Sequence, residues 1–476
     1  MIPISEISAI AIYVAILFVI GFWSYKGHKT ADDFIIGDRS LNFWLTALAA
    51  HASDMSSWLF MGFPAIIFVG GVFNAWFAIG LTFFMFLNWL LVAPRIRIQT
   101  EEYNSLTFSS FFESHFHDTS GLIRIFTAVM SFVFYTIYIS AGIVGLGLLI
   151  ETLFNIPYHL GITIGIFVII PYLFIGGYTT LAWLDLFQGL FLMIVIVAVP
   201  LFVLPQVGGL SGVSKALDTY HVSKSLLPNL KLETFWNIFL SLCGWGVGYF
   251  GQPHIITKFM GIRKVTDMRK SMAVGMSWQA ITMCFATLIG LIAIAYYQGS
   301  LDNPELAFVL MVKKTFSPMI MAFILCAVLA ATISTMDSQI LVLASSLTED
   351  FYKRIFRKAA SQKELLWISR AFVLAVTVIS FSIAFFKIST IYSLVFYAWS
   401  GLGSSFGPLL LFSLYSKKAN KYGAWAGILV GGFTSLIWPL VNQTVSPLIP
   451  GFLLGSLAIY LGSVLMRDKF HIHEKT

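Results

Sequence analysis

The sequence predicts an all-α polytopic membrane protein with about thirteen transmembrane helices. Three observations support this prediction: the composition is unusually apolar, the apolar residues fall into runs of membrane-spanning length, and the basic residues are unevenly divided between the connections. Of the 476 residues, 58% are hydrophobic and 11% are charged, whereas soluble domains carry about 25% charged residues. A cytosolic enzyme, a disordered chain and a small disulfide-linked scaffold are therefore excluded.

The apolar runs have the length that a bilayer demands, because a helix needs about 20 mostly apolar residues to cross the hydrocarbon core. The thirteen runs lie at about 6–25, 41–69, 72–94, 123–150, 159–178, 186–206, 234–252, 271–297, 318–347, 366–386, 391–415, 422–441 and 448–466. We expect a single transmembrane domain over residues 1–476. The inverted-repeat core of this domain is expected at about 41–415. Helices 12 and 13 follow it at about 422–466, and residues 467–476 form a cytoplasmic tail.

The basic residues indicate how the chain is oriented. If the N-terminus lies outside, 23 of the 29 lysines and arginines fall on cytoplasmic connections or in the C-terminal tail, as the positive-inside rule requires. We therefore expect an outside N-terminus, a cytoplasmic C-terminus and an odd number of spans. The net charge of +7 then reflects topology, and no nucleic-acid partner is expected.

Two of the expected helices contain stretches that fit poorly into a regular helix. Residues 51–58 in the second run include five polar residues, and residues 244–254 in the seventh combine four glycines with Pro253. Irregular backbone at membrane depth is tolerated where it lines a cavity, although glycines also serve close helix packing. Because the two stretches lie five helices apart, they fit two inverted repeats, helices 2–6 and 7–11, each opening with a broken helix.

Three acidic residues, Asp54, Asp185 and Asp337, lie within or at the head of apolar runs. An aspartate at the centre of a membrane helix costs about 2.5–3.5 kcal/mol to insert, so it normally faces a cavity, an ion or a partner. Capping of nearby backbone is the alternative, above all for Asp185. Since no lysine or arginine is expected at similar depth, we expect each acid to meet a bound cation or to stay protonated.

The ninth run carries a cluster of small polar residues. Ser334, Asp337 and Ser338 share one helix face at i, i+3 and i+4. Together with Ala331 and Thr335 they offer carbonyl and hydroxyl oxygens to a cation such as sodium. Interhelical hydrogen bonding is the alternative for any one of these hydroxyls, but the grouping on one face favours an ion site.

At these residues the chain resembles the sodium:solute symporter family over nearly its whole length. The matching segments are Asp32-Asp33-Phe34 through Arg39-Ser40-Leu41, Ala52 to Ser56, Gly244 to His254, Ala330 to Thr335 and Ser346 to Lys353. The resemblance implies thirteen helices with a LeuT-like inverted-repeat core of five plus five helices. It implies a symporter that couples sodium entry to import of L-proline by alternating access across the bacterial inner (plasma) membrane.

The resemblance also implies roles for individual residues. The sodium site would comprise carbonyls of Ala52, Met55 and Ala331 with the hydroxyls of Ser334 and Thr335, and Asp54 would be the acid needed for sodium-coupled binding. The solute pocket would comprise Tyr138, Trp245 and Tyr249, with Trp58 closing it and Ser56 beside it, and Arg39 would act in coupling. A second sodium site, described in some relatives, would use Asp185 and Ser338, with Asp337 at the position where members differ.

Other readings of the chain stay open. The same scaffold could carry another amino acid or a carboxylate, and one or two sodium ions could move per cycle. A membrane sensor built on this fold is the third possibility. No enzymatic activity and no cofactor are expected, apart from sodium as the co-transported ion. We expect proline, sodium and membrane lipid as the partners, and a chain that functions as a monomer.

Overall fold

The computed structural model describes residues 4–25, 31–175 and 177–466, and this part of the chain is almost entirely helical. Each of the thirteen apolar runs coincides with a helix or a broken helix. Ten helices in the described part are long and apolar enough to cross a membrane, so the count of thirteen spans stays a prediction. The predicted tail 467–476 lies outside the described residues, as do the basic residues Lys26 and Lys29.

The long helices follow the apolar runs closely. They are α1 (Ile4–Ser24), α8 (Leu122–Phe154), α9 (Tyr158–Ile175), α10 (Tyr178–Val203), α14 (Met268–Tyr296), α16 (Pro318–Ser346), α17 (Gln362–Phe385), α18 (Ile391–Tyr415), α19 (Lys421–Val441) and α20 (Leu448–Leu465). Two runs are broken, into α3 (Phe43–Met55) with α4 (Gly62–Gly70), and α12 (Leu232–Gly246) with α13 (Pro253–Met260). A π-helical turn at Asn88–Val92 joins α5 (Trp76–Leu87) to α6 (Ala93–Glu102). Short helices lie at α2 (Ala31–Ile36), α7 (Phe108–His115), α11 (Gly209–Thr219) and α15 (Ala307–Thr315).

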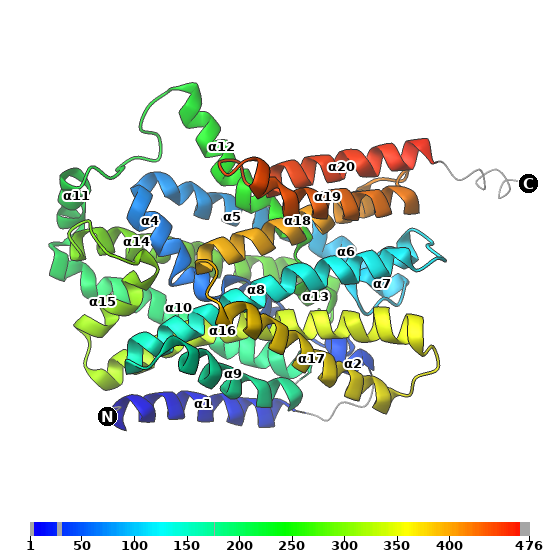
Figure 1. The fold of residues 1–476 in the computed structure, drawn as a ribbon, viewed down its shortest axis with the longest axis horizontal. Coiled ribbons are helices and arrows are strands. Elements are labelled where there is room, and N and C mark those ends of the chain that lie inside the picture. The colour runs from blue at the N-terminus through cyan, green and yellow to red at the C-terminus, as the bar shows by residue number, and fades with distance from the viewer. Residues whose placement is uncertain (1–3, 26–30, 176, 467–476) are drawn as a thin grey trace, which may run out of the picture.

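The helices form an elongated bundle, and most of them run roughly parallel to its long axis (Figure 1). Most residues of α8, α16 and α18 are buried, so these helices form the centre of the bundle, whereas most residues of α1, α19 and α20 are not buried. Apolar side chains such as Leu232 and Leu440 are more than four-fifths exposed, which suits a lipid environment. The start of α1 and the end of α20 lie at opposite ends of the bundle, as an odd number of crossings requires.

The two predicted breaks are confirmed, and the first falls later than the polar run suggested. α3 stays helical through His51 and Asp54 and ends at Met55. The break begins at Ser56, whose φ of 45° lies in the left-handed region that side chains rarely adopt. Its hydroxyl accepts a hydrogen bond from Trp58 N at 3.2 Å, which helps to hold this turn.

The second break lies between α12 and α13. A 3₁₀ turn at 247–251 leads to an extended Gln252, and Pro253 starts α13 at a position where its missing N–H costs nothing. Two of the glycines also serve helix packing: a Cβ on Gly248 would collide with Trp399, and one on Gly251 would lie 2.6 Å from Gly407 N. Both interpretations of the glycine-rich run therefore hold, since it is a break that packs tightly on α18.

Candidate functional site

The end of α3 meets the middle of α16 through the polar atoms that the sequence singled out. Ser334 Oγ lies 2.9 Å from the carbonyl oxygen of Ala52 and 3.2 Å from that of Ala331. Thr335 Oγ1 lies 3.1 Å from the same Ala331 oxygen and accepts a hydrogen bond from Ser56 N at 2.9 Å. Four of the five predicted sodium ligands thus form one connected group, and the fifth, Met55, directly precedes Ser56.

This group has the chemistry of a cation site in a broken helix. All four residues are almost completely buried, and their facing atoms are carbonyl and hydroxyl oxygens. A hydroxyl can turn its hydrogen aside and offer a lone pair, so the same oxygens that bond one another can face a cation. The Ala52 carbonyl lies in the last turn of α3, where carbonyls lack a partner within the helix, and carbonyls at a helix break are the usual ligands of sodium in transporters of this plan.

A second connection joins the two broken helices. Tyr249, in the break between α12 and α13, donates its hydroxyl hydrogen to Asp54 Oδ2 at 2.5 Å. Gln279 Nε2 on α14 lies 3.3 Å from the same hydroxyl, and Asn88 Nδ2 donates to the Tyr249 carbonyl at 3.2 Å. Asp54 therefore lies between the cation group on α3 and the break that carries Tyr249. Sequence reasoning missed Gln279 and Asn88, because single amides within apolar runs give no distinctive pattern.

Aromatic side chains gather beside this connection. The rings of Trp58 and Trp245 lie 5.0 Å apart between centroids, and those of Tyr249 and Trp399 lie 5.0 Å apart at 90°. Trp399 Nε1 donates to the Trp245 carbonyl at 2.8 Å. Three of the predicted pocket residues thus belong to one aromatic cluster, to which the structure adds Trp399 of α18.

Tyr138 on α8 is the fourth predicted pocket residue, and it is buried. Its ring lies edge-on to that of His254, with the centroids 6.1 Å apart. His254 follows Pro253 at the start of α13, and its backbone N–H donates to the hydroxyl of Tyr135 at 2.9 Å. α8 therefore contacts the second break from the side of α13.

Asp185 has a basic partner, contrary to the expectation that no lysine or arginine lies at its depth. Lys258 Nζ on α13 lies 3.0 Å from Asp185 Oδ2 on α10, and both side chains are at most 2% exposed. The ammonium also lies 5.2 Å from the centre of the Tyr178 ring. The expectation was wrong because Lys258 lies between two apolar runs and, from the sequence, belongs to a cytoplasmic connection. In the structure the helix resumes after Pro253 and carries the lysine into the protein.

The two other residues of the predicted second sodium site lie on α16. Asp337 and Ser338 are both about 1% exposed. The Ser338 hydroxyl has no hydrogen-bond partner among the described residues. The Asp185 carboxylate faces the Lys258 ammonium, so a positive charge already lies where the sequence predicted a cation.

Arg39 ties together three segments at one end of the bundle. Its guanidinium donates to the carbonyl oxygens of Thr100, Ser105 and Met260 at 2.9–3.0 Å. Next to it, Leu41 N donates to the Gly261 carbonyl, and the Leu41 carbonyl accepts from Arg263 N at 2.8 Å. The chain leading into α3 is thus bonded to the chain leaving α13, so the two broken helices are held together at this end.

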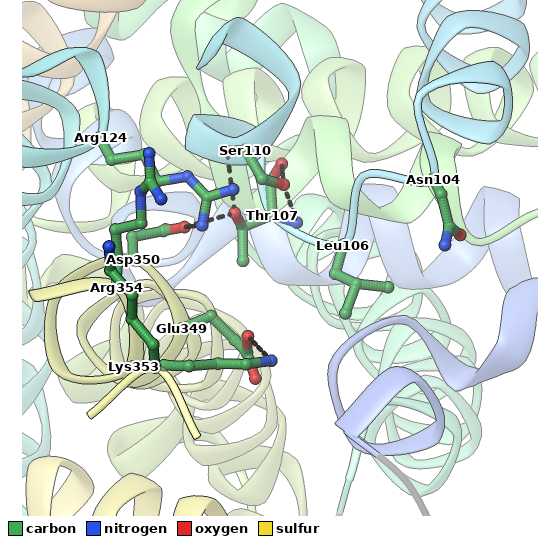
Figure 2. Close-up of a pocket in the computed structure, with 10 residues that line it drawn as sticks. Asn104, Leu106, Thr107, Ser110, Arg124, Glu349, Asp350, Lys353 and Arg354 are labelled. Carbon is green, nitrogen blue, oxygen red and sulfur yellow. Dashed lines mark hydrogen bonds and ion pairs between the residues drawn. The ribbon is translucent and has the colours of Figure 1, made fainter. Parts of the chain in front are cut away.

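A second polar cluster lies at the same end, beside a cavity of about 370 Å³. The carboxylate of Asp350, which follows α16, accepts hydrogen bonds from Thr107 at 3.0 Å, from Ser346 at 2.8 Å and from Ser109. Arg124 approaches the same carboxylate at 3.3 Å, and Figure 2 shows Thr107 and Arg124 beside Asp350. The segment before α7 is therefore fixed to the helix that carries Ser334 and Thr335.

A model of the sodium:solute symporter family matches residues 34–431. The chain belongs to the sodium:solute symporter family. The High-affinity proline transporter PutP of Bacillus subtilis (strain 168) is 39% identical to it, over 97% of this chain and 99% of that protein. The Sodium/proline symporter of Escherichia coli (strain K12) is 37% identical, over 95% and 92%. A solved Na⁺-coupled sialic acid symporter, in a substrate-bound outward-open state, is 18% identical with a TM-score of 0.82, and the match covers 98% of both chains.

Membership in the sodium:solute symporter family fits the geometry described above. The chain is a multi-pass membrane transporter with a LeuT-like core, not an enzyme, and sodium is the ion that the family co-transports. In a core of this kind, ions and solutes bind at discontinuous helices, and α3–α4 and α12–α13 are the two broken helices of this chain.

Replacing Ser334 by alanine is expected to weaken sodium activation of transport by about tenfold or more. A neutral group that contacts a charge contributes about 1.5–3 kcal/mol, and Ser334 supplies one of the two side-chain hydroxyls of the predicted sodium site. The measurement is the sodium concentration for half-maximal uptake. Thr332→Val is the matched control on the same helix, because the Thr332 hydroxyl bonds only to the Val328 carbonyl of its own helix. An unchanged sodium dependence in Ser334→Ala would remove this hydroxyl from the ion site.

Proposed function

We propose that this protein is a sodium-coupled symporter that imports L-proline across the bacterial inner membrane by alternating access. The observation that carries the proposal is the chain of contacts from the oxygen group of α3 and α16, through Asp54 and Tyr249, to the aromatic cluster. It joins a site suited to sodium with one suited to a small, partly apolar solute. The names of the relatives that share more than a third of its residues point to proline.

The aromatic cluster suits proline, which is a zwitterion with an apolar ring. The rings of Trp58, Trp245 and Tyr249 offer apolar walls for the pyrrolidine ring. The buried Trp58 Nε1 has no hydrogen-bond partner among the described residues, so this N–H is available to the solute carboxylate. The start of α13, where the helix dipole presents partial positive charge, favours the same group.

The free energy that drives this transport is the sum of the electrical and the concentration terms for one sodium ion. One positive charge moving through 100 mV gains about 2.3 kcal/mol, and a tenfold concentration gradient adds about 1.4 kcal/mol. The sum of about 3.7 kcal/mol concentrates a neutral solute on the order of 500-fold. Binding of sodium between α3 and α16 would stabilise the end of α3 and thereby order Asp54 and Tyr249, and the coupling must be reciprocal.

We further propose an outside N-terminus and a cytoplasmic C-terminus, on the basis of the basic residues. The end of the bundle with Arg39 and Asp350 is then cytoplasmic, and its contacts hold that side closed. We propose one sodium ion per cycle, bound at the α3–α16 group, because Lys258 already neutralises Asp185. We propose that the chain acts as a monomer surrounded by lipid.

Equilibrium binding of radiolabelled L-proline to the purified protein tests the substrate assignment. We expect proline to bind at least tenfold more tightly in sodium than in choline, and unlabelled proline to compete better than other amino acids. If another amino acid or a carboxylate competes better, the scaffold stands and the substrate is that solute. Binding that ignores sodium would contradict the proposal.

A further inference from the structure

One face of α14 contacts both broken helices, although α14 supplies none of the predicted sodium ligands or pocket residues. Gly275, Trp278 and Gln279 share this face, because they are spaced at i, i+3 and i+4. α14 packs on α3 and on α4, and Gln279 reaches the second break by its contact with Tyr249. The face is therefore placed to act on both breaks at once.

The first part of this face lies against His51 of α3. A Cβ on Gly275 would lie 2.3 Å from His51 Nε2, so a side chain at this position would displace the imidazole. The ring of Trp278 lies 5.8 Å from that of His51 between centroids, and Trp89 Nε1 donates to His51 Nε2 at 3.1 Å. Because His51 directly precedes Ala52, α14 packs against the turn of α3 that carries a proposed sodium ligand.

Trp278 also fixes the direction in which Gln279 points. Its indole N–H donates to the carbonyl oxygen of Gly189 on α10 at 2.9 Å, and the side chain is buried. This bond sets the rotation of α14 about its own axis, and the side chain of the next residue must follow that rotation. Gln279 is thereby held towards Tyr249 by a contact that involves neither broken helix.

Gln279 begins a chain of hydrogen bonds that ends at Asp54. An ionised carboxylate can only accept, and a tyrosine hydroxyl has one hydrogen, so the Tyr249 hydroxyl donates to Asp54 Oδ2. The Tyr249 oxygen keeps its lone pairs as acceptors, and Gln279 Nε2 donates to it at 3.3 Å. All three side chains are buried. The chain therefore has one direction, from Gln279 through Tyr249 to Asp54.

The amide strengthens the bond that follows it in this chain. Hydrogen bonds in a buried chain polarise one another, so a donor to the Tyr249 oxygen makes the Tyr249 hydroxyl a better donor to Asp54. The backbone of Tyr249 is held separately, since its carbonyl accepts from Asn88 Nδ2 at 3.2 Å. Asn88 lies in the π-helical turn between α5 and α6, and such turns are frequent at functional sites.

We propose that Gln279 is a positioning residue for sodium coupling. By donating to Tyr249 it holds the tyrosine hydroxyl on Asp54, and it contacts neither the ion nor the solute. This inference rests on the proposed function, since it assigns Gln279 to the link between the sodium group and the aromatic cluster. α14 thereby takes part in coupling through one amide.

The test is a double-mutant cycle in the full-length protein on Gln279→Met and Tyr249→Phe. Methionine keeps a long, flexible side chain but has no N–H to donate, and phenylalanine lacks the hydroxyl. The measured quantity is the sodium concentration that gives half-maximal binding of radiolabelled L-proline. We expect each single variant to raise it about fivefold, the effect of one neutral hydrogen bond. The double variant should be no weaker than Tyr249→Phe alone, because both changes break the same chain.

Gln188→Met is the matched control. Gln188 Nε2 makes the same kind of bond, to the Tyr13 hydroxyl at 3.2 Å between α10 and α1, and Gln188 is as deeply buried as Gln279. This variant should leave the half-activating sodium concentration unchanged. If Gln279→Met does not fold, as judged by thermal unfolding, Gln279→Asn replaces it in the cycle, because its amide is one methylene too short to reach the hydroxyl.

Two results would overturn the positioning role and leave the proposed function intact. One is an unchanged half-activating sodium concentration in Gln279→Met. The other is a double variant about 25-fold weaker than the unmodified protein, which is the product of two independent effects. Proline binding that does not respond to sodium in the unmodified protein would instead overturn the proposed function.

Discussion

Replacement of Lys258 by methionine is expected to destabilise the folded protein by about 3–5 kcal/mol, the usual cost of removing one partner from a buried ion pair. Lys258 Nζ and Asp185 Oδ2 lie 3.0 Å apart with both side chains buried, so the variant leaves a carboxylate without its counter-charge. The measurement is thermal unfolding of the purified protein in detergent, which should show a large fall in midpoint temperature.

The double variant Lys258→Met/Asp185→Leu is the control. Buried ion pairs can often be replaced by apolar residues at little cost or even with a gain, so stability should largely return. If the single variant unfolds like the unmodified protein, the ion pair does not contribute as proposed.

Under the proposed function, Lys258 also limits transport to one sodium ion per cycle. With Lys258 in place, we expect uptake to depend on sodium with a Hill coefficient near 1, since that coefficient cannot exceed the number of coupled sites. A value approaching 2 would show that a second ion binds despite the ammonium, and would restore the second site at Asp185, Asp337 and Ser338.

Asp54→Asn is expected to weaken sodium binding roughly 30-fold. The residue lies between Ala52 and Met55, two of the proposed sodium ligands on α3. A full negative charge near the bound ion contributes about 2 kcal/mol at an effective dielectric constant of about 20. The substitution keeps the size of the side chain and leaves an oxygen that can accept the Tyr249 hydroxyl. The measurement is sodium-dependent proline binding, with affinity for each partner determined at saturating levels of the other.

Two variants help to interpret this result. Asp302→Asn, on an exposed connection, should have no effect. Tyr249→Phe removes the hydrogen bond to Asp54 but keeps the charge, so it should reduce sodium affinity less than Asp54→Asn does. Full sodium affinity in Asp54→Asn would show that the Asp54 charge is not used.

The helices and the group of oxygen atoms between α3 and α16 could be predicted, because the bilayer sets the length of a spanning helix and helical geometry sets which residues share a face. The bilayer fixes the length of an apolar run, so the positions of α8 and α16 follow from hydropathy alone. The spacing of Ser334 and Ser338 places them on one face of α16, and the resemblance to known transporters supplied Ala52 as the facing residue. Those contacts appear in the structure, although the break in α3 begins only at Ser56.

What the sequence did not reveal depends on contacts between distant segments. Lys258 follows a proline and looks like part of a basic connection, and nothing along the chain indicates that α13 brings it to Asp185, 73 residues away. Trp399 and Gln279 join the site through helix packing and not through any local pattern.

The most direct test of sodium-coupled symport is uptake of radiolabelled L-proline into proteoliposomes that carry an inward sodium gradient and an inside-negative potential. With a tenfold gradient and 100 mV, we expect transient accumulation above equilibrium, up to a limit on the order of 500-fold for one ion per proline. Accumulation should disappear when choline replaces sodium. Equal uptake with sodium and with choline would contradict the account of how α3, α16 and Tyr249 couple the ion to the solute.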